Sequence, residues 1–118
     1  MVVSRNTRQK ELLGEVAQSF EAFFDAEDLL AKTKDKKLGI ATVYRFLKEE
    51  VKQGRLHAYN CNRRMVYSKN KQHCHMVCKN TGKTIHFDID NIDFIKNKIP
   101  GSIISIQIEV TGICEDCD

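Results

Sequence analysis

The chain has 118 residues, of which 42% are hydrophobic and 30% are charged, a normal balance for a globular protein. That length allows one ordinary domain or two small ones. No run of about 18 apolar residues is present, which excludes a membrane-spanning helix. The first ten residues are polar and lack the apolar stretch of a secretory signal, so we expect a cytoplasmic protein without a membrane partner.

The net charge of +3 is unevenly distributed along the sequence. Residues 1–71 hold 15 Lys and Arg against 9 Asp and Glu, whereas residues 72–118 hold 4 against 7. A basic half followed by an acidic half suggests two modules, the first of which could bind a polyanion such as nucleic acid. Solvated helix faces would explain the same charge pattern.

Three helices are predicted in the first half of the sequence. Thr7 can cap the first helix, and Asp25 with Asp28 forms a capping-box pattern that opens the second. Residues 40–53 show the apolar periodicity of a third helix. Gly54 follows at the position where a helix commonly ends.

A β-hairpin is predicted next. Two alternating runs, residues 55–59 and 65–68, flank a polar and basic turn at 60–64. Three helices followed by a hairpin with a basic tip are typical of a winged helix-turn-helix. The polar residues 68–72 then predict a hinge.

The second half predicts a small α/β unit. Residues 75–78 and 83–87 have the pattern of two strands, Asp90 can cap a short helix that runs to residue 98, and residues 103–110 form a strand rich in β-branched side chains. A unit this small buries too little apolar surface to be stable alone. We expect it to need a metal, a partner subunit or both.

The outer face of the predicted third helix suggests DNA binding. Its apolar positions leave Thr42, Tyr44 and Arg45 pointing outward. Such side chains reach base edges and phosphates when a helix lies in the major groove. Further phosphate contacts are expected from basic residues near the N-terminus and on the hairpin, namely Arg8, Lys10, Arg63 and Arg64. The alternative is an amphipathic helix with a solvated outer face.

Two histidines, His73 and His75, lie two positions apart in a predicted strand. They point to the same side of the strand, so two imidazoles can bind one metal while Cys74 faces the other way. A packed or solvent-facing role for the pair is the alternative.

Three cysteines suggest a structural zinc site. Cys114 and Cys117 form a C-x-x-C half-site that suits a tetrahedral ion, and Cys78 would be the third ligand. Thr81 stands where a fourth cysteine would complete the site. A thiol–disulfide pair of Cys114 and Cys117, or cysteines without a ligand, are the alternatives.

Enzymatic chemistry is not indicated. The sequence contains no combination of a nucleophile with a base and no glycine-rich loop for phosphate. A thiol oxidoreductase is disfavoured because its C-x-x-C pair precedes a helix, whereas Cys117 is the penultimate residue. We therefore expect a binding protein.

Seven short motifs follow one another along residues 7–117. They are T-R-Q-K at 7–10, D-A-E at 25–27, A-T-V-Y-R at 41–45, Gly54 with the hairpin after it, H-x-H-x-x-C at 73–78, G-K at 82–83 and G-x-C-x-x-C at 112–117. In this combination and order the sequence resembles the ferric uptake regulator (Fur) family of metal-dependent bacterial repressors.

The resemblance implies an α+β architecture with two domains. Residues 1–69 would form a winged-helix DNA-binding domain, and residues 73–118 a small α/β domain for metal binding and dimerisation. It also implies a homodimer on a palindromic double-stranded DNA operator. A regulatory metal between the domains would bring the two DNA-binding lobes to the right separation.

The resemblance also implies roles for particular residues. Tyr44 and Arg45 would be the recognition-helix contacts, and His73 and His75 would bind the regulatory metal. Cys78, Cys114 and Cys117 would hold structural zinc. His57 matches a ligand position of the zinc-sensing branch, and Cys61 lies near the hinge as a further candidate ligand. Asp93 matches an acidic ligand of an additional site, and His86 replaces a common acidic residue without an assigned role.

Several family ligands are absent. Phe23 with Phe24, Ser68 and Ile106 stand where the family commonly has histidine or acidic ligands. The softer nitrogen and sulfur donors that remain favour zinc over iron or manganese at the regulatory site. The alternative is a redox-sensing or metal-independent regulator of the same fold, with cysteines as the switch.

Overall fold

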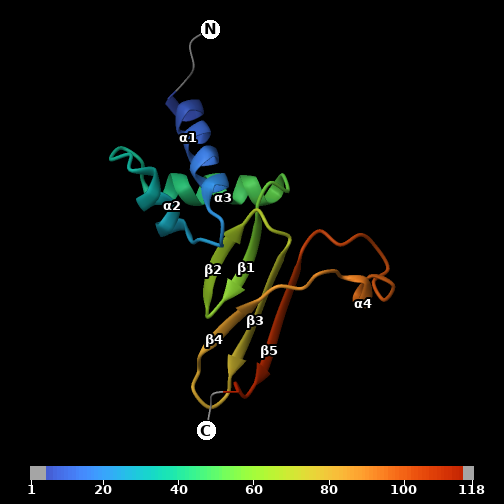
Figure 1. The fold of residues 1–118 in the computed structure, drawn as a ribbon. Helices are drawn as coiled ribbons and strands as arrows, with labels where there is room; N and C mark the ends of the chain where they lie inside the picture. The colour runs from blue at the N-terminus through green and yellow to red at the C-terminus, as the bar shows by residue number, and fades with distance from the viewer. Residues whose placement is uncertain (1–4, 116–118) are drawn as a thin grey trace. The chain divides into compact units, whose positions relative to one another are not determined.

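The computed structural model describes residues 5–115 and contains two compact units, one that ends at Asn70 and one that begins at Lys71 (Figure 1). Within the described residues, no helix has the length and hydropathy needed to cross a membrane.

The first unit consists of three helices and a β-hairpin. The helices are α1 (Arg5–Ser19), α2 (Ala26–Thr33) and α3 (Ile40–Lys52), and the hairpin pairs β1 (His57–Cys61) with β2 (Arg64–Ser68) in antiparallel register. A single bridge between Phe24 and Tyr67 extends this small sheet. The element order confirms the predicted helices and hairpin.

The core of this unit comes from the apolar stripes of the helices. On α3, Val43, Phe46 and Leu47 are buried as their spacing predicts. They pack with apolar residues of the other helices and of the segments just before α2 and β1, including Leu13, Ala17, Phe24, Leu29 and Leu56. This core holds the outer face of α3 toward solvent.

The ends of the helices follow their capping residues, with one correction. Asp25 accepts a hydrogen bond from the backbone N–H of Asp28 at 2.7 Å, and the Asp28 side chain accepts one in return at 3.0 Å, as predicted. Gly54 has a φ of 77°, which confirms its place after α3. The predicted cap at Thr7 is wrong, because α1 already includes Arg5 and Thr7 lies inside the helix.

The turn of the hairpin is shorter than predicted. Cys61 pairs with Arg64, so only Asn62 and Arg63 remain between the strands. Their φ angles of 53° and 65° are those of the tight turn that matches the twist of a hairpin. Cys61 therefore belongs to β1 and not to the turn.

The second unit is a three-stranded sheet with a short helix. Its elements are β3 (Gln72–Cys78), β4 (Thr84–Phe87), α4 (Asp93–Lys96) and β5 (Ile106–Gly112). The strand order is β4-β3-β5, with β4 antiparallel and β5 parallel to the central strand.

Three boundaries in this unit differ from the predictions. β3 begins at Gln72, within the residues predicted as a hinge, because its whole length pairs with β5. α4 is a single turn with Ile92 at its N-cap, so Asp90 does not cap it. β5 begins at Ile106 and not at residue 103.

The register of the sheet separates polar from apolar side chains. His75 pairs with His86 on one side and with Glu109 on the other, so these three side chains share a face with His73. The opposite face carries apolar side chains and a cysteine: Cys74, Met76, Ile85, Phe87, Ile108 and Val110.

The second unit buries few large apolar side chains. Its buried residues, among those described, are His73, Cys74, His75 and Cys78. Apolar side chains that remain exposed include Phe94 at 58%, Ile104 at 72% and Val110 at 42%. Histidine and cysteine thus occupy positions that a self-sufficient core would give to leucine or valine.

We expect Asp25→Ala to lower the free energy of unfolding by about 1 kcal/mol, because it removes the N-cap acceptor of α2. Asp25→Asn keeps an oxygen acceptor and should retain most of that stability. Urea unfolding followed by helical circular dichroism measures both, since α1, α2 and α3 all lie in the first unit. Equal stability of the two variants would show that the cap contributes nothing.

Candidate functional site

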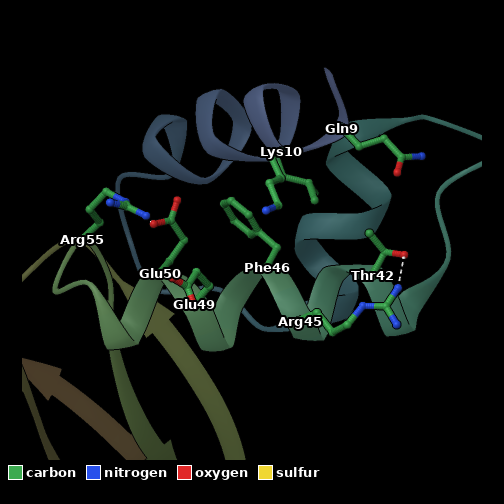
Figure 2. Close-up of a pocket in the computed structure, with 9 residues that line it drawn as sticks. Gln9, Lys10, Thr42, Arg45, Phe46, Glu49, Glu50 and Arg55 are labelled. Carbon is green, nitrogen blue, oxygen red and sulfur yellow. Dashed lines mark hydrogen bonds and ion pairs between the residues drawn. The ribbon is translucent and has the colours of Figure 1, made fainter. Parts of the chain in front are cut away.

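A pocket lies between α1 and α3 of the first unit (Figure 2). Lys10 contributes from α1, while Thr42 and Arg45 contribute from α3. An Arg45 guanidinium nitrogen donates a hydrogen bond to the Thr42 hydroxyl oxygen at 3.1 Å. Three of the residues predicted to contact DNA therefore surround one hollow.

Tyr44 lines a second hollow of the same unit, which is also lined by the start of α2 and by the hairpin. Its side chain is 53% exposed, and Arg64 and Met65 of β2 line the same hollow. An Arg64 guanidinium nitrogen lies 3.3 Å from a carboxylate oxygen of Asp25. This ion pair ties the hairpin to the residue that caps α2.

The remaining predicted DNA contacts are exposed. Arg8 lies on α1, and Arg63 lies in the hairpin turn. Together with Lys10, Arg45 and Arg64 they place positive charge on α1, α3 and the hairpin. That these residues contact DNA stays a prediction.

Three histidines of the second unit form a cluster on one face of its sheet. His73 and His75 come from β3, and His86 comes from β4. The ring centroids are 5.2 Å apart for His73 and His75, 5.3 Å for His73 and His86, and 5.9 Å for His75 and His86. One nitrogen atom from each ring lies within 4.8 Å of the others, a spacing that can hold a metal ion.

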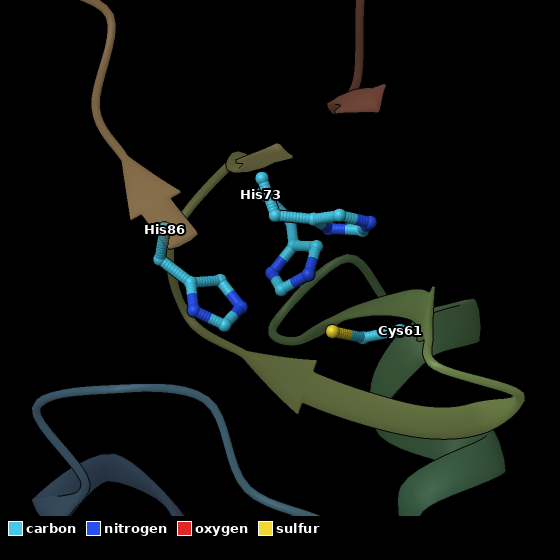
Figure 3. A group of neighbouring side chains, drawn as sticks. Cys61, His73 and His86 are labelled. Carbon is cyan, nitrogen blue, oxygen red and sulfur yellow. The ribbon is translucent and has the colours of Figure 1, made fainter. Parts of the chain in front are cut away.

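Figure 3 draws the His73 and His86 side chains as neighbours within this cluster. From the sequence, His73 and His75 were predicted to bind one metal ion, and His86 had no assigned role. Its pairing partner His75 lies eleven positions earlier in the sequence, across a turn. The period-two pattern of β4 alone could not reveal which residue His86 faces.

The cluster favours neutral imidazoles, which are the form that binds metal. Burial lowers the pKa of His73, and the nearby His75 and His86 lower it further. Burial also lowers the pKa of His86, with a contribution from His75. The packing that brings the rings together therefore disfavours protonation of His73 and His86.

His75 has an additional partner on β5. Its Nε2 atom lies 3.0 Å from Oε1 of Glu109, and the His75 side chain is 1% exposed. Glu109 was not singled out from the sequence. An isolated acidic residue in a β-branched strand carries no signal of its partner.

His57 and Cys61, the other predicted regulatory ligands, both lie on β1 in the first unit. They are buried and share a face of the strand with Tyr59 between them. Four residues of strand span about 13 Å, and side chains stand roughly perpendicular to it. His57 and Cys61 are thus well separated along β1, and that both bind the regulatory metal ion stays a prediction.

The predicted structural zinc site is represented by Cys78 and Cys114, since Cys117 lies outside the described residues. The two sulfur atoms are 3.2 Å apart, and the backbone N–H of Cys114 donates a hydrogen bond to Cys78 Sγ at 3.4 Å. That hydrogen bond, with others from Thr81 and Asn80, lowers the pKa of Cys78 to about 7. Thr81 thus supports the Cys78 thiolate without being a sulfur ligand.

Cys114 is disulfide-bonded in this structure, whereas Cys78 beside it is not part of a disulfide. A sulfur in a disulfide is not a thiolate and does not bind zinc. The residues therefore do not fit a structural zinc ion in this oxidation state. Reduction is required before Cys114 can act as a ligand.

We expect the metal-free protein to lose stability as the pH falls below about 6.5. His73 has a lowered pKa in the folded state, so the unfolded chain binds its proton at a higher pH than the folded chain does. This contribution to stability is fully present at a pH above the pKa of His73 in the unfolded chain. It is lost as the pH falls toward the lower pKa of His73 in the folded chain.

Urea unfolding in chelator at pH 7.5 and 5.5 measures this loss. His73→Gln should reduce the difference between the two pH values, because glutamine does not titrate. An unchanged difference in the variant would contradict the prediction.

Comparison with known proteins identifies the family. The sequence model described as "Ferric uptake regulator family" matches residues 3–111. A ferric uptake regulation protein of Campylobacter upsaliensis is 29% identical, with 95% of this chain and 79% of that protein covered.

Solved structures agree with this assignment. The ferric uptake regulator Fur of Helicobacter pylori, whose structure reveals three functional metal binding sites, matches with a TM-score of 0.67 at 23% identity, over 97% of this chain and 84% of that one. FurB of M. tuberculosis, a zinc uptake regulator, matches with a TM-score of 0.53 at 27% identity, over 97% and 95%. The chain thus has an α+β fold with an N-terminal helix-turn-helix and belongs to the ferric uptake regulator family of metal-responsive transcriptional regulators.

Proposed function

We infer that this chain is a zinc-responsive repressor that binds a DNA operator as a homodimer. The observation that carries this function is the cluster of His73, His75 and His86, whose nitrogen atoms lie within 4.8 Å of one another. Three imidazoles are a donor set that suits zinc, while iron and manganese sites use more oxygen ligands.

A fourth ligand is proposed from the first unit. Cys61 is a buried cysteine on β1, and its thiolate would complete a tetrahedral set of three nitrogens and one sulfur. His57 is the competing candidate. The variants Cys61→Ser and His57→Gln distinguish the two candidates, because only replacement of the true ligand should weaken zinc binding.

Ligands from both units provide the physical basis of regulation. A zinc ion supplies a link that only ligands from both units can complete, so the population shifts toward fewer arrangements. DNA affinity rises if one of the retained arrangements is the one that fits the operator.

The DNA-binding surface is proposed on the first unit. Tyr44 and Arg45 of α3 would reach the major groove, with Thr42 beside them. Arg8, Lys10, Arg63 and Arg64 would contact phosphates on either side. Because the operator would be palindromic, each protomer would occupy one half-site.

We expect zinc to be required for operator binding. A random double-stranded DNA library selected with zinc-loaded protein supplies the probe, and fluorescence anisotropy then measures affinity with zinc, manganese, ferrous iron or chelator. His86→Ala should lose the zinc response, and Arg45→Ala should weaken binding about tenfold or more through a lost base contact. Lys83→Ala, an exposed charge change in the second unit, is the control. Affinity that ignores metal and chelator would contradict this function.

Dimerisation is proposed through the apolar face of the second unit. Val110 is 42% exposed and Phe87 is 37% exposed on the face opposite the histidines. Burying such side chains against a second copy would supply the core that this unit lacks.

Val110→Asp should therefore convert the dimer into a monomer, because it would bury an unpaired charge in the interface. Thr111→Asp changes the next residue of β5, which faces the other side of the sheet, and should leave the dimer intact. Sedimentation equilibrium measures both. A monomeric wild-type chain, or a dimer that survives Val110→Asp, would contradict the proposed interface.

A redox-sensing regulator is the second candidate function. The disulfide at Cys114 next to the low-pKa thiol of Cys78 is the observation that favours it. Metal-free protein whose operator affinity changes between peroxide and dithiothreitol would support this alternative. Zinc that binds only after reduction would instead support a structural zinc site on Cys78, Cys114 and Cys117.

A further inference from the structure

Glu109 lies beside the histidine cluster without being one of the proposed ligands. We propose that Glu109 is a positioning residue that holds His75 in the tautomer required for metal binding. The proposal rests on the proposed function, because it concerns the same cluster. It assigns to β5 a role in the metal site.

The backbone places the two side chains together. β5 runs parallel to β3, and in their register His75 is the direct partner of Glu109. Direct partners on neighbouring strands point to the same face of a sheet. The contact is therefore built by strand pairing and does not depend on a loop.

The hydrogen bond determines which nitrogen of His75 can act as a metal ligand. The Nε2 atom lies 3.0 Å from the carboxylate oxygen Oε1 of Glu109. A carboxylate accepts, so Nε2 must carry the proton and donate. A protonated nitrogen cannot bind a metal ion, which leaves Nδ1 of His75 as the ligand atom.

Two effects on metal binding follow. The hydrogen bond fixes the orientation of the His75 ring, which is buried with 1% of its side chain exposed, and it also makes the ring a stronger donor. Loss of such a partner commonly weakens metal affinity about 10–100-fold.

Glu109 contributes little to folding in comparison. Its side chain is 61% exposed, and ion pairs with an exposed partner contribute little to stability. A variant at this position should therefore separate metal affinity from stability. This difference distinguishes a positioning role from a merely structural one.

The first test is the protonation state of His75 in full-length, reduced, zinc-loaded protein. Long-range 1H–15N correlation spectra distinguish protonated, unprotonated and metal-bound imidazole nitrogens. The chain has only four histidines, so single His→Gln variants assign the signals. We expect a protonated Nε2 and a zinc-bound Nδ1 for His75. A zinc-bound Nε2 would overturn the proposal.

The second test is zinc affinity measured by competition with a chelator. Glu109→Thr removes the acceptor while keeping a residue suited to a strand, and should weaken zinc binding 10–100-fold. Glu109→Gln retains an acceptor oxygen without the charge and should recover part of the affinity. Asp90→Asn removes an exposed carboxylate of the same unit and should match the wild type.

The outcomes also separate this proposal from the proposed function. Wild-type protein that binds zinc with the same affinity as Glu109→Thr would overturn the role of Glu109 alone. Wild-type protein without an exchangeable zinc ion would overturn both. A melting temperature of metal-free Glu109→Thr equal to that of the wild type, together with weaker zinc binding, supports the positioning role.

Discussion

The parallel pairing of β3 with β5 is the constraint on which the second unit depends. It aligns seven consecutive residue pairs, from Gln72 with Ile106 to Cys78 with Gly112. Because side chains alternate along a strand, this register places Glu109 on the face of His73 and His75, and Ile108 and Val110 on the opposite, apolar face. A shift of one residue would place Glu109 among the apolar side chains and separate it from His75. The contact of Glu109 with the histidine cluster and the β5 side of the proposed dimer interface therefore depend on one alignment, whereas His86 joins the cluster through the pairing of β3 with β4.

The second unit has potential metal ligands at buried positions where other domains have apolar core residues. Its buried positions hold His73, Cys74, His75 and Cys78, which contribute less hydrophobic stabilisation than leucine or isoleucine would. Metal ligation and dimerisation both favour the folded state by mass action when their partners are present. A unit of this kind responds to its ligands through its own stability, which suits a regulator.

The first unit is organised differently, since its core is complete without a ligand. The apolar stripe of α3 packs against α1, α2 and the segments just before α2 and β1, so the outer face of α3 is held in place. The pair of Arg64 and Asp25 links the hairpin to the N-cap of α2. A rigid support of this kind keeps Tyr44 and Arg45 at constant positions relative to the hairpin. In the proposed function, regulation therefore leaves the shape of the proposed DNA-binding surface unchanged.

The sequence by itself determined the elements whose signals are local. The capping box at Asp25, the stripe of α3, the glycine after it and the histidine pair of β3 all depend on spacings of two to four residues. It also supplied the family, through motifs spread along the chain. Only the tertiary structure decided which distant residues meet, namely His86 with His75 across a turn and Glu109 with His75 through parallel pairing. It also decided that α4 is a single turn. The pairing of distant strands leaves no periodic pattern in a single sequence. It depends on the register between two strands, which is established only when the sheet forms.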